Sequence, residues 1–307
     1  MWFKNLKIYQ FTQSFELSDQ QLNEQLSSAE FSPCSKHQLS SYGWLSPLAN
    51  ISKKPEQMMI HGSADFVIFC AKEEQKLLPA AVINDLLHEK IATIESKEGH
   101  KIGKKQKDLL KEELVIDLLP RAFSRYFQNY AYIDRINQLL IVDAASSNKA
   151  EQLTEFMRKT IGTLPIIPIT PTSPIEQTLT SWLANNDIPA ELELGQSCEL
   201  KDPSEDGGIV RCSKHDLISD EIKNHIEAGK MVTKLALIWQ DKIEFTLHDD
   251  MSIKRVRLTD TLMDQMDDSS DDDAITRFDA DFNLMALEFS QFIPALLAIF
   301  NAEKTAS

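Results

Sequence analysis

Two consecutive helical segments between residues 79 and 119 constrain the fold of this chain most, because they are long and joined by only a short basic turn. Pro79 can open the first helix, its apolar residues recur at helical spacing, and Gly99 can end it. The second helix is expected over residues 104–119. At roughly 16 to 20 residues, each would be about 25–30 Å long. The sequence therefore predicts a protruding helical hairpin with lysines gathered at its tip.

The rest of the sequence alternates between strand and helix patterns. Strands are predicted where apolar and β-branched residues alternate or cluster, and the last three of them form an antiparallel meander: residues 2–11, 65–70, 121–133, 139–143, 164–170, 209–211, 230–239, 242–247 and 253–258. Helices are predicted after capping residues, at 18 onwards, 148–161, 174–182 and 219–228, and capping boxes are expected at Ser18 with Gln21 and at Ser173 with Glu176. Residues 31–44, which mix Pro, Ser, Cys and Gly, indicate loop and turn.

The C-terminal residues 281–300 form a helix pattern that is apolar nearly all round, so this helix should be buried. Four prolines in residues 165–174 mark a candidate domain boundary. We expect an α+β protein with mixed or antiparallel sheets. Residues 1–170 would form an N-terminal α/β region that includes the helical hairpin at about 79–119. Residues 171–307 would form a C-terminal α+β region with the meander and the buried helix.

Charge is distributed unevenly along the chain, whose formal net charge is −15. Residues 97–111 hold six lysines against two acids, and residues 254–257 (KRVR) are a second basic stretch. Residues 260–281 hold nine acids and one arginine. A basic inner surface and an acidic outer one would let the protein bind DNA in one place and repel it elsewhere. The alternative is that these stretches are solvated faces without a ligand.

The overall composition indicates a folded, soluble protein. Hydrophobic residues make up 42% and charged residues 26% of the chain, which is ordinary for globular proteins. No signal-peptide pattern and no run of about 18 apolar residues is present, so neither export nor a membrane anchor is expected. Four scattered cysteines fit free thiols in a reducing compartment. We expect a cytoplasmic protein.

Motifs that carry enzyme chemistry are weak in this sequence. Residues 99–105 (GHKIGKK) resemble a phosphate-binding loop, but the spacing is one residue short and the Ser or Thr that would hold Mg²⁺ is missing. Asp267, Asp268 and residues 271–273 could be a two-metal nuclease site, although acidic runs are usually solvated loops. The histidines lack ligand-like spacing. We expect no catalytic residue, no metal site and no cofactor.

Basic clusters without a base-reading module predict contacts to phosphate, which place a protein on DNA without conveying sequence. Lys230 and Lys234 should share one face of a strand, since side chains repeat every two residues. Arg121 and Arg125 lie between the basic hairpin and a strand, where salt bridges within the protein and phosphate contacts are both open interpretations.

Several blocks of the sequence together resemble one family, the bacterial recombination-associated protein RdgC. They are residues 1–6 (MWFKNL), 31–34 (FSPC), 43–44 (GW), 119–125 (LPRAFSR), 205–208 (EDGG), 224–230 (NHIEAGK), 232–237 (VTKLAL) and 277–282 (RFDADF). These blocks span nearly the whole chain in order.

The resemblance implies a subunit that pairs through two contacts into a ring-shaped homodimer with a positively charged hole. Such a protein would bind double-stranded DNA with little sequence preference, bind single-stranded DNA more weakly, associate with the nucleoid, and restrain the recombinase RecA by occupying its substrate. By similarity, Phe123 and the helical tip form one dimer contact, and the segment around Lys214 forms the other. The family's basic-then-amide pair stands here as Lys214 and His215, which leaves the role of His215 open. Without the resemblance, Phe123 would be an ordinary core aromatic.

Eleven side chains are the expected DNA contacts: Lys97, Lys101, Lys104, Lys105, Lys107, Arg121, Arg125, Arg211, Lys214, Lys230 and Lys234. The expected dimer contacts are Phe123, Lys214 and His215. The alternative function is an interaction protein that acts directly on the recombinase through its acidic surface at residues 260–281.

Overall fold

The computed structural model describes residues 2–51, 58–204, 206–263 and 273–300. The fold is α+β and is built on a twelve-stranded sheet with the order β2-β4-β5-β6-β1-β12-β11-β10-β8-β9, in which β3 also pairs with β4 and β7 with β1. The strands are β1 Asn5–Phe11, β2 Ser40–Leu45, β3 Ile60–Gly62, β4 Phe66–Leu77, β5 Phe123–Asp134, β6 Leu139–Asp143, β7 Ile166–Pro168, β8 Leu192–Lys201, β9 Ile209–Ser213, β10 Met231–Trp239, β11 Ile243–His248 and β12 Ile253–Leu258. Every pairing between these strands is antiparallel.

Helices cover the two faces of this sheet unequally. They are α1 Asp19–Ser27, α2 Ala80–Glu98, α3 Lys104–Leu118, α4 Ser147–Ile161, α5 Ile175–Asn185, α6 Asp220–Glu227, α7 Asp260–Met263 and α8 Ala274–Ile299, with a 3-10 turn at Leu119–Arg121. One hydrophobic cluster joins α5, α6 and α8 to one face of the sheet in both halves of the chain. The other joins α1 and α4 to the opposite face, in the N-terminal half only. The opposite face of the C-terminal strands therefore carries no helix among the described residues.

Alternation along the strands produces these two clusters. Tyr132 is buried with the first cluster, whereas its neighbours Ala131 and Ile133 are buried with the second. Strand β1 joins the halves, because it pairs with β6 on one side and with β12 on the other. Strands that precede residues 165–174 and strands that follow them therefore belong to one continuous sheet. The division into two regions at that point stays a prediction.

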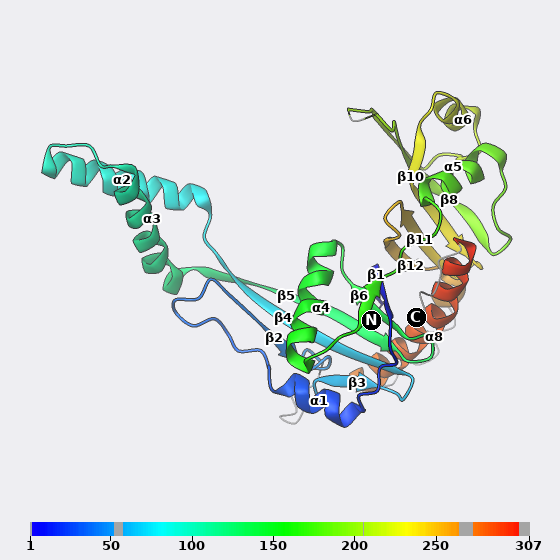
Figure 1. Cartoon of the computed structure of the whole chain (residues 1–307), viewed down its shortest axis with the longest axis horizontal. Coiled ribbons are helices and arrows are strands. Elements are labelled where there is room, and N and C mark those ends of the chain that lie inside the picture. Colours follow the sequence, from blue (N-terminus) through cyan, green and yellow to red (C-terminus); the bar gives the residue numbers. More distant parts are fainter. Residues whose placement is uncertain (1, 52–57, 205, 264–272, 301–307) are drawn as a thin grey trace.

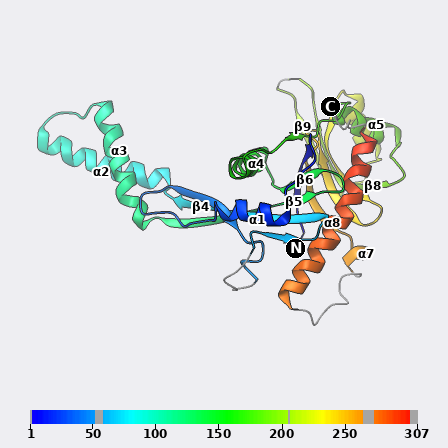
Figure 2. The same ribbon diagram turned by 60° about the horizontal axis from the view of Figure 1, so that its bottom comes forward.

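Helix α8 confirms the prediction of a buried C-terminal helix. Phe278, Phe282, Phe289 and Phe292 are each at most 4% exposed and lie in the first cluster. The helix begins at Ala274, earlier than predicted, because the Asp273 carboxylate accepts hydrogen bonds from the backbone N–H of the first turn. By length and composition α8 could cross a membrane. Its role in the core explains the apolar sequence instead (Figure 2).

Helices α2 and α3 project from the ends of β4 and β5, and together they are called the α2–α3 arm here (Figure 1). Gly99 ends α2 in the left-handed conformation with a φ of 71°, as its sequence position predicts. The two helices contact each other, and the Lys90 ammonium lies 3.0 Å from the Glu113 carboxylate. Within the arm, only Ile83, Ile102 and Leu110 are buried apolar side chains.

Three local predictions differ from the structure. Residues 40–45, expected to be loop, form β2 because they pair with β4 at the edge of the sheet. Strand β8 was not predicted, although it lies between β9 and β10. The capping box expected at Ser173 is absent, since Pro174 itself is the N-cap of α5 and no side chain caps this helix.

The elements together form an open crescent (Figure 1). The α2–α3 arm lies at one end, and strands β8 to β12 lie at the other. Helix α4 lies between them on the open side of the crescent. Because α4 covers the second face of the sheet, the helix-free C-terminal part of that same face belongs to the open side as well.

Candidate nucleic-acid interface

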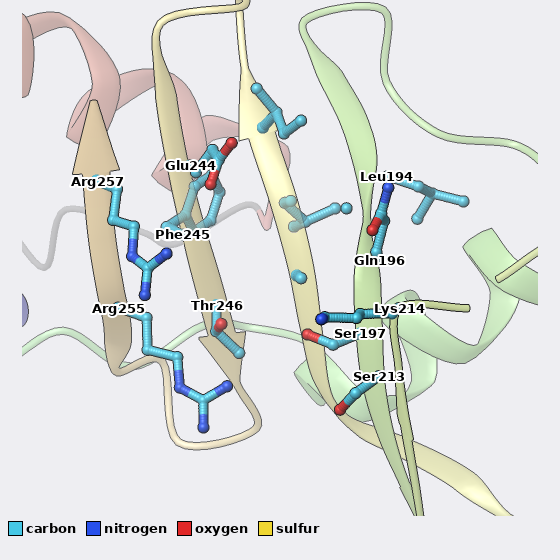
Figure 3. Close-up of a pocket in the computed structure, with 14 residues that line it drawn as sticks. Leu194, Gln196, Ser197, Ser213, Lys214, Glu244, Phe245, Thr246, Arg255 and Arg257 are labelled. Atoms are coloured by element: carbon cyan, nitrogen blue, oxygen red, sulfur yellow. The ribbon is translucent and has the colours of Figure 1, made fainter. Parts of the chain in front are cut away.

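A groove of about 560 Å³ lies on the helix-free face of β8, β10, β11 and β12. Ser197, Ala236, Thr246 and Gly195 line it together with larger residues such as Leu194 and Ile238. A Cβ atom on Gly195 would come within 2.8 Å of the Ala236 Cβ atom, so the two strands can pack here only without a side chain at this position. Arg255, Arg257 and Lys214 stand at the rim (Figure 3). The groove therefore has a mixed polar and apolar lining and three cations at its edge.

Arg255 reaches the groove because of a β-bulge in β12. Glu244 pairs with Arg257 and Thr246 pairs with Lys254, so two steps along β11 match three steps along β12. Arg255 sits in this bulge with a φ of 54°, in the left-handed region that non-glycine residues rarely adopt. Ile253 and Val256 both stay in the core. In regular alternation Arg255 would point to the core side with Ile253, so the bulge brings it to the same face as Arg257.

Lys214 has the same backbone property. It follows β9 directly, is exposed, and has a φ of 54°. Left-handed conformations of non-glycine residues are uncommon and are often kept at binding sites, where surrounding structure holds them in place. Two cations at the rim of one groove, Arg255 and Lys214, share this conformation.

The cations at the rim have no acidic partner in the described part of the chain. No carboxylate there lies within 4.0 Å of the charged groups of Arg255, Arg257, Lys214 or the neighbouring Lys254. Glu244 is the one acidic residue among those that line the groove. Positive charge without an internal partner is available to an external anion.

Three cations predicted to contact DNA are instead paired within the protein. The Glu199 carboxylate, 12% exposed, lies 2.7 Å from both the Lys234 ammonium and the Arg211 guanidinium. Burial raises the pKa of Glu199, but the hydrogen bonds from Lys234 and Arg211 outweigh it and hold this pKa below its usual value. Lys230 lies 3.8 Å from the Asp202 carboxylate. These pairs reduce the charge that each cation can offer to phosphate.

The prediction that Lys230 and Lys234 share one face is wrong. Val232 pairs with Leu200 and Lys234 pairs with the next residue, Glu199, so β10 carries a bulge between them. Leu200 and Glu199 point to opposite faces, and the bulge therefore places Val232 and Lys234 on opposite faces too. Lys230, which precedes Val232 by two residues, lies on the other side of the sheet from Lys234.

His248 lies beside this basic region, next to a second hollow of about 310 Å³ that also contacts Lys254 and Arg255. It is opposite Lys234 in the β10–β11 pairing. Burial, followed by the charges of Lys254 and Lys234, lowers the pKa of His248 to about 4. This imidazole is therefore neutral at neutral pH, as expected for a histidine surrounded by cations.

The five lysines predicted at the helical tip lie at the end of α2, in the turn and in the first turn of α3, and all are exposed: Lys97, Lys101, Lys104, Lys105 and Lys107. The structure places them at the end of the crescent opposite the groove (Figure 1). The residues 99–105 join two helices, so they do not have the strand-to-helix geometry of a phosphate-binding loop. One subunit thus carries two separate basic surfaces.

Phe123 begins β5 and is 85% exposed, so the interpretation of this residue as a core aromatic is wrong. Leu77 lies opposite it in the β4–β5 pairing and is 45% exposed. Ile116 and Tyr126, which precede and follow it, are also about half exposed. Phe123 and Leu77 thus form a cross-strand pair of exposed apolar side chains, and contiguous exposed apolar surface can mark an interaction site.

The remaining predicted residues are exposed or surface-paired. Arg121 is exposed in the 3-10 turn. Arg125 is exposed in β5 and its guanidinium lies 4.5 Å from the centre of the Phe127 ring. His215 is half-buried after β9, with its Nε2 atom 3.3 Å from both the Glu221 carboxylate and the Ser219 hydroxyl. His215 and Lys214 are neighbours beside the free edge of β9.

Arg255 and Arg257 are the residues that sequence reasoning missed as a site. Their basic stretch at residues 254–257 was visible in the sequence, but regular alternation assigns Arg255 and Ile253 to one side of the strand. Only the bulge allows all three of Lys254, Arg255 and Arg257 to avoid the core.

The described residues contain no group of three or more His, Cys, Asp or Glu side chains that could hold a metal ion. Of the acidic residues considered for a nuclease site, Asp273 caps α8. Asp267, Asp268, Asp271 and Asp272 lie outside the described residues. Most of the acidic surface expected at residues 260–281 lies outside them as well.

Comparison with known proteins identifies the family. A family model described as "Putative exonuclease, RdgC" matches residues 1–303. Proteins named "Recombination-associated protein RdgC" from Aeromonas hydrophila, Psychromonas ingrahamii and Yersinia pestis are 44%, 45% and 44% identical over 304, 305 and 303 residues. Each match covers 99% of this chain and at least 99% of the relative. Because the family model matches residues 1–303 and these relatives are 44–45% identical over nearly their full length, the chain belongs to the RdgC family of recombination-associated proteins.

Proposed function

We propose that this protein binds duplex DNA without reading its sequence, as a ring-shaped homodimer, and thereby limits access of the recombinase RecA to DNA. It acts in the cytoplasm in association with the nucleoid, and it binds single-stranded DNA more weakly. No catalytic step is part of this proposal. The family's association with recombination supports DNA as the partner.

The observation that carries the proposal is the set of unpaired cations on the helix-free face of the sheet. Arg255, Arg257 and Lys214 surround the groove without a carboxylate partner among the described residues. Arginine and lysine side chains without an internal partner favour phosphate contacts, which carry no sequence information. The exposed lysines at the tip of the α2–α3 arm offer a second phosphate-binding surface on the same subunit.

Exposed apolar residues support the dimer. Phe123 is 85% exposed and lies where the α2–α3 arm joins β5. It fits a contact with the second subunit, in which the arm would close one side of the ring. Lys214 and His215, beside the free edge of β9, fit the second contact. Two crescents joined at both ends would surround a hole, with the groove on its wall.

The central test is a gel-shift titration of naked duplex DNA over a series of salt concentrations. We expect log K to fall steeply with log salt, by about 0.9 for each phosphate contacted, and to change little when the DNA sequence is shuffled. The double variant Arg255→Gln/Arg257→Gln should flatten this slope by roughly 0.9 per lost contact. Lys36→Gln, at an exposed lysine in the loop before β2, is the matched control.

Three outcomes would contradict the proposal. Absence of binding to naked DNA would favour the alternative in which the protein acts on the recombinase directly. Reproducible DNA cleavage in Mg²⁺ or Mn²⁺ that Asp271→Ala or Asp272→Ala abolishes would mean that the acidic run is a nuclease site. Sedimentation that shows only monomers at micromolar concentration would remove the ring.

A further inference from the structure

Two cysteines lie directly opposite each other at the end of the sheet that carries the groove. Cys198 is in β8 and Cys212 is in β9, and the antiparallel pairing places them as partners. Both are free thiols. Because they are paired residues, their side chains are on the same face of the sheet, and both contact the first hydrophobic cluster.

The backbone spacing suits a covalent bond between the two sulfur atoms. Directly opposite residues of antiparallel strands have Cα atoms about 4.5 or 5.5 Å apart, according to their place in the ladder. Disulfides form at Cα separations of about 4.4–6.8 Å. Either ladder position therefore satisfies the distance without moving the strands. The thiols also interact, since burial and then the nearby Cys212 side chain raise the pKa of Cys198 to about 12.

The two thiols differ in exposure in a way that suits stepwise oxidation. Cys212 is half-buried, so a small oxidant can reach it, whereas Cys198, its partner across the ladder, is only 5% exposed. The other two cysteines have no such partner: Cys34 has its Sγ atom 3.8 Å from the Glu74 carbonyl oxygen, and Cys70 is buried in β4.

We propose that Cys198 and Cys212 form a reversible intramolecular disulfide when the protein meets a peroxide. The Cys212 thiolate attacks one oxygen of hydrogen peroxide, the O–O bond breaks, and hydroxide leaves, which gives a sulfenic acid. The Cys198 sulfur then attacks the Cys212 sulfur, the S–O bond breaks, and a second hydroxide leaves. In total two thiols and one peroxide give one disulfide and two waters, and a thiol reductant, which is itself oxidised to a disulfide, restores the two protein thiols.

The bond would act on the edge of the candidate interface. Within the described part of the chain, strand β9 is the last strand of the sheet and pairs only with β8, so its amides are exposed to local opening. Ser197 and Ser213, the neighbours of the two cysteines, both line the groove, and Lys214 follows. A covalent link between β8 and β9 would hold this wall of the groove, and the free edge beside His215, in one arrangement. The proposal does not require that the groove binds DNA.

The test uses the full-length protein with Cys34→Ser and Cys70→Ser, so that only the pair can react. After treatment with a small excess of hydrogen peroxide, a non-reducing digest should contain a peptide in which Cys198 and Cys212 are cross-linked, and dithiothreitol should release it. Hydrogen exchange of the β9 amides should slow by about tenfold in the oxidised protein.

Single variants separate the steps. With Cys198→Ser in the same background, Cys212 should stop at a sulfenic acid that dimedone traps; with Cys212→Ser, Cys198 should stay reduced. Circular dichroism and thermal melting show whether each variant is folded. Persistence of both thiols under conditions that oxidise Cys34 in the wild-type protein, or cross-links that join only separate subunits, would overturn the proposal. Loss of DNA binding would leave it standing, because the cross-link is measured without DNA.

Discussion

The α2–α3 arm and the groove face of the C-terminal sheet both carry exposed cations, but they hold them in different ways. The arm presents its lysines on two helices with few buried side chains, at positions that follow from local sequence. The groove presents Arg255 and Arg257 on strands that rest on a core containing α5 and α8. The backbone that carries the arm lysines is supported by few buried contacts, whereas the strands that carry Arg255 and Arg257 rest on a large core. The two basic surfaces therefore differ in stability although both carry positive charge: the groove is supported by a large core, and the arm is not.

The largest expected effect tests this difference in packing. Phe292 is fully buried under β10 and β11, where it contacts Trp239 and Phe245. Phe292→Ala should lower the free energy of unfolding by about 3–5 kcal/mol, because it removes an aromatic side chain and leaves a cavity. Val82→Ala in the arm, at a residue that is 47% exposed, should change it by less than about 0.5 kcal/mol. Urea unfolding of both variants compares them; equal losses would mean that the arm is part of the cooperative core.

A second prediction concerns charge that the protein neutralises by itself. Glu199→Gln removes the carboxylate shared by Lys234 and Arg211. Because hydrogen bonds to a charged group are lost, the free energy of unfolding should fall by about 1.5–3 kcal/mol. The two freed cations should strengthen DNA binding and steepen its salt dependence by up to about 0.9 per added phosphate contact.

The matched control for that variant is Glu193→Gln, at an exposed glutamate of the same strand. It should leave both the stability and the salt slope nearly unchanged. A weaker DNA affinity for Glu199→Gln would indicate that Glu199 orients Lys234 and Arg211 for binding.

A third prediction separates the backbone role of Arg255 from its charge. Its φ of 54° is free of strain for glycine but not for alanine. Arg255→Gly should therefore be more stable than Arg255→Ala by about 1 kcal/mol, while both lose the same phosphate contact. Thermal melting measures the first quantity and salt-dependent binding the second. If the glycine variant were the less stable one, the bulge would not hold Arg255 in this conformation.

The smallest effect is the pH dependence that His248 confers. Because its pKa is lowered to about 4 in the folded protein, the unfolded chain takes up a proton first as pH falls below about 6.5. This histidine therefore contributes a loss of stability between about pH 6.5 and 4. In His248→Asn, the free energy of unfolding should fall less steeply with pH over this range, because unfolding then takes up fewer protons, by up to about one. Denaturant unfolding at several pH values tests it, with His100→Asn in the exposed turn of the arm as the control.

Sequence alone determined those features that depend on residues close together in the chain. Gly99 ends α2, Ser18 and Gln21 form the capping box of α1, and the meander alternates, because turn, cap and strand patterns act over a few residues. The lysines of the arm tip were found for the same reason. The blocks that resemble the RdgC family were also readable without a structure, and the comparisons confirm them.

Tertiary structure decided which cations are available. Regular period-two alternation predicts that Lys230 and Lys234 lie together and that Arg255 points to the core, and two β-bulges reverse both predictions. A bulge arises from pairing with a strand distant in sequence, so no local pattern reveals it. Ion pairs follow the same logic: Glu199 neutralises Lys234 and Arg211 only because β8, β9 and β10 are adjacent. The pairing of Cys198 with Cys212 is likewise a property of the sheet.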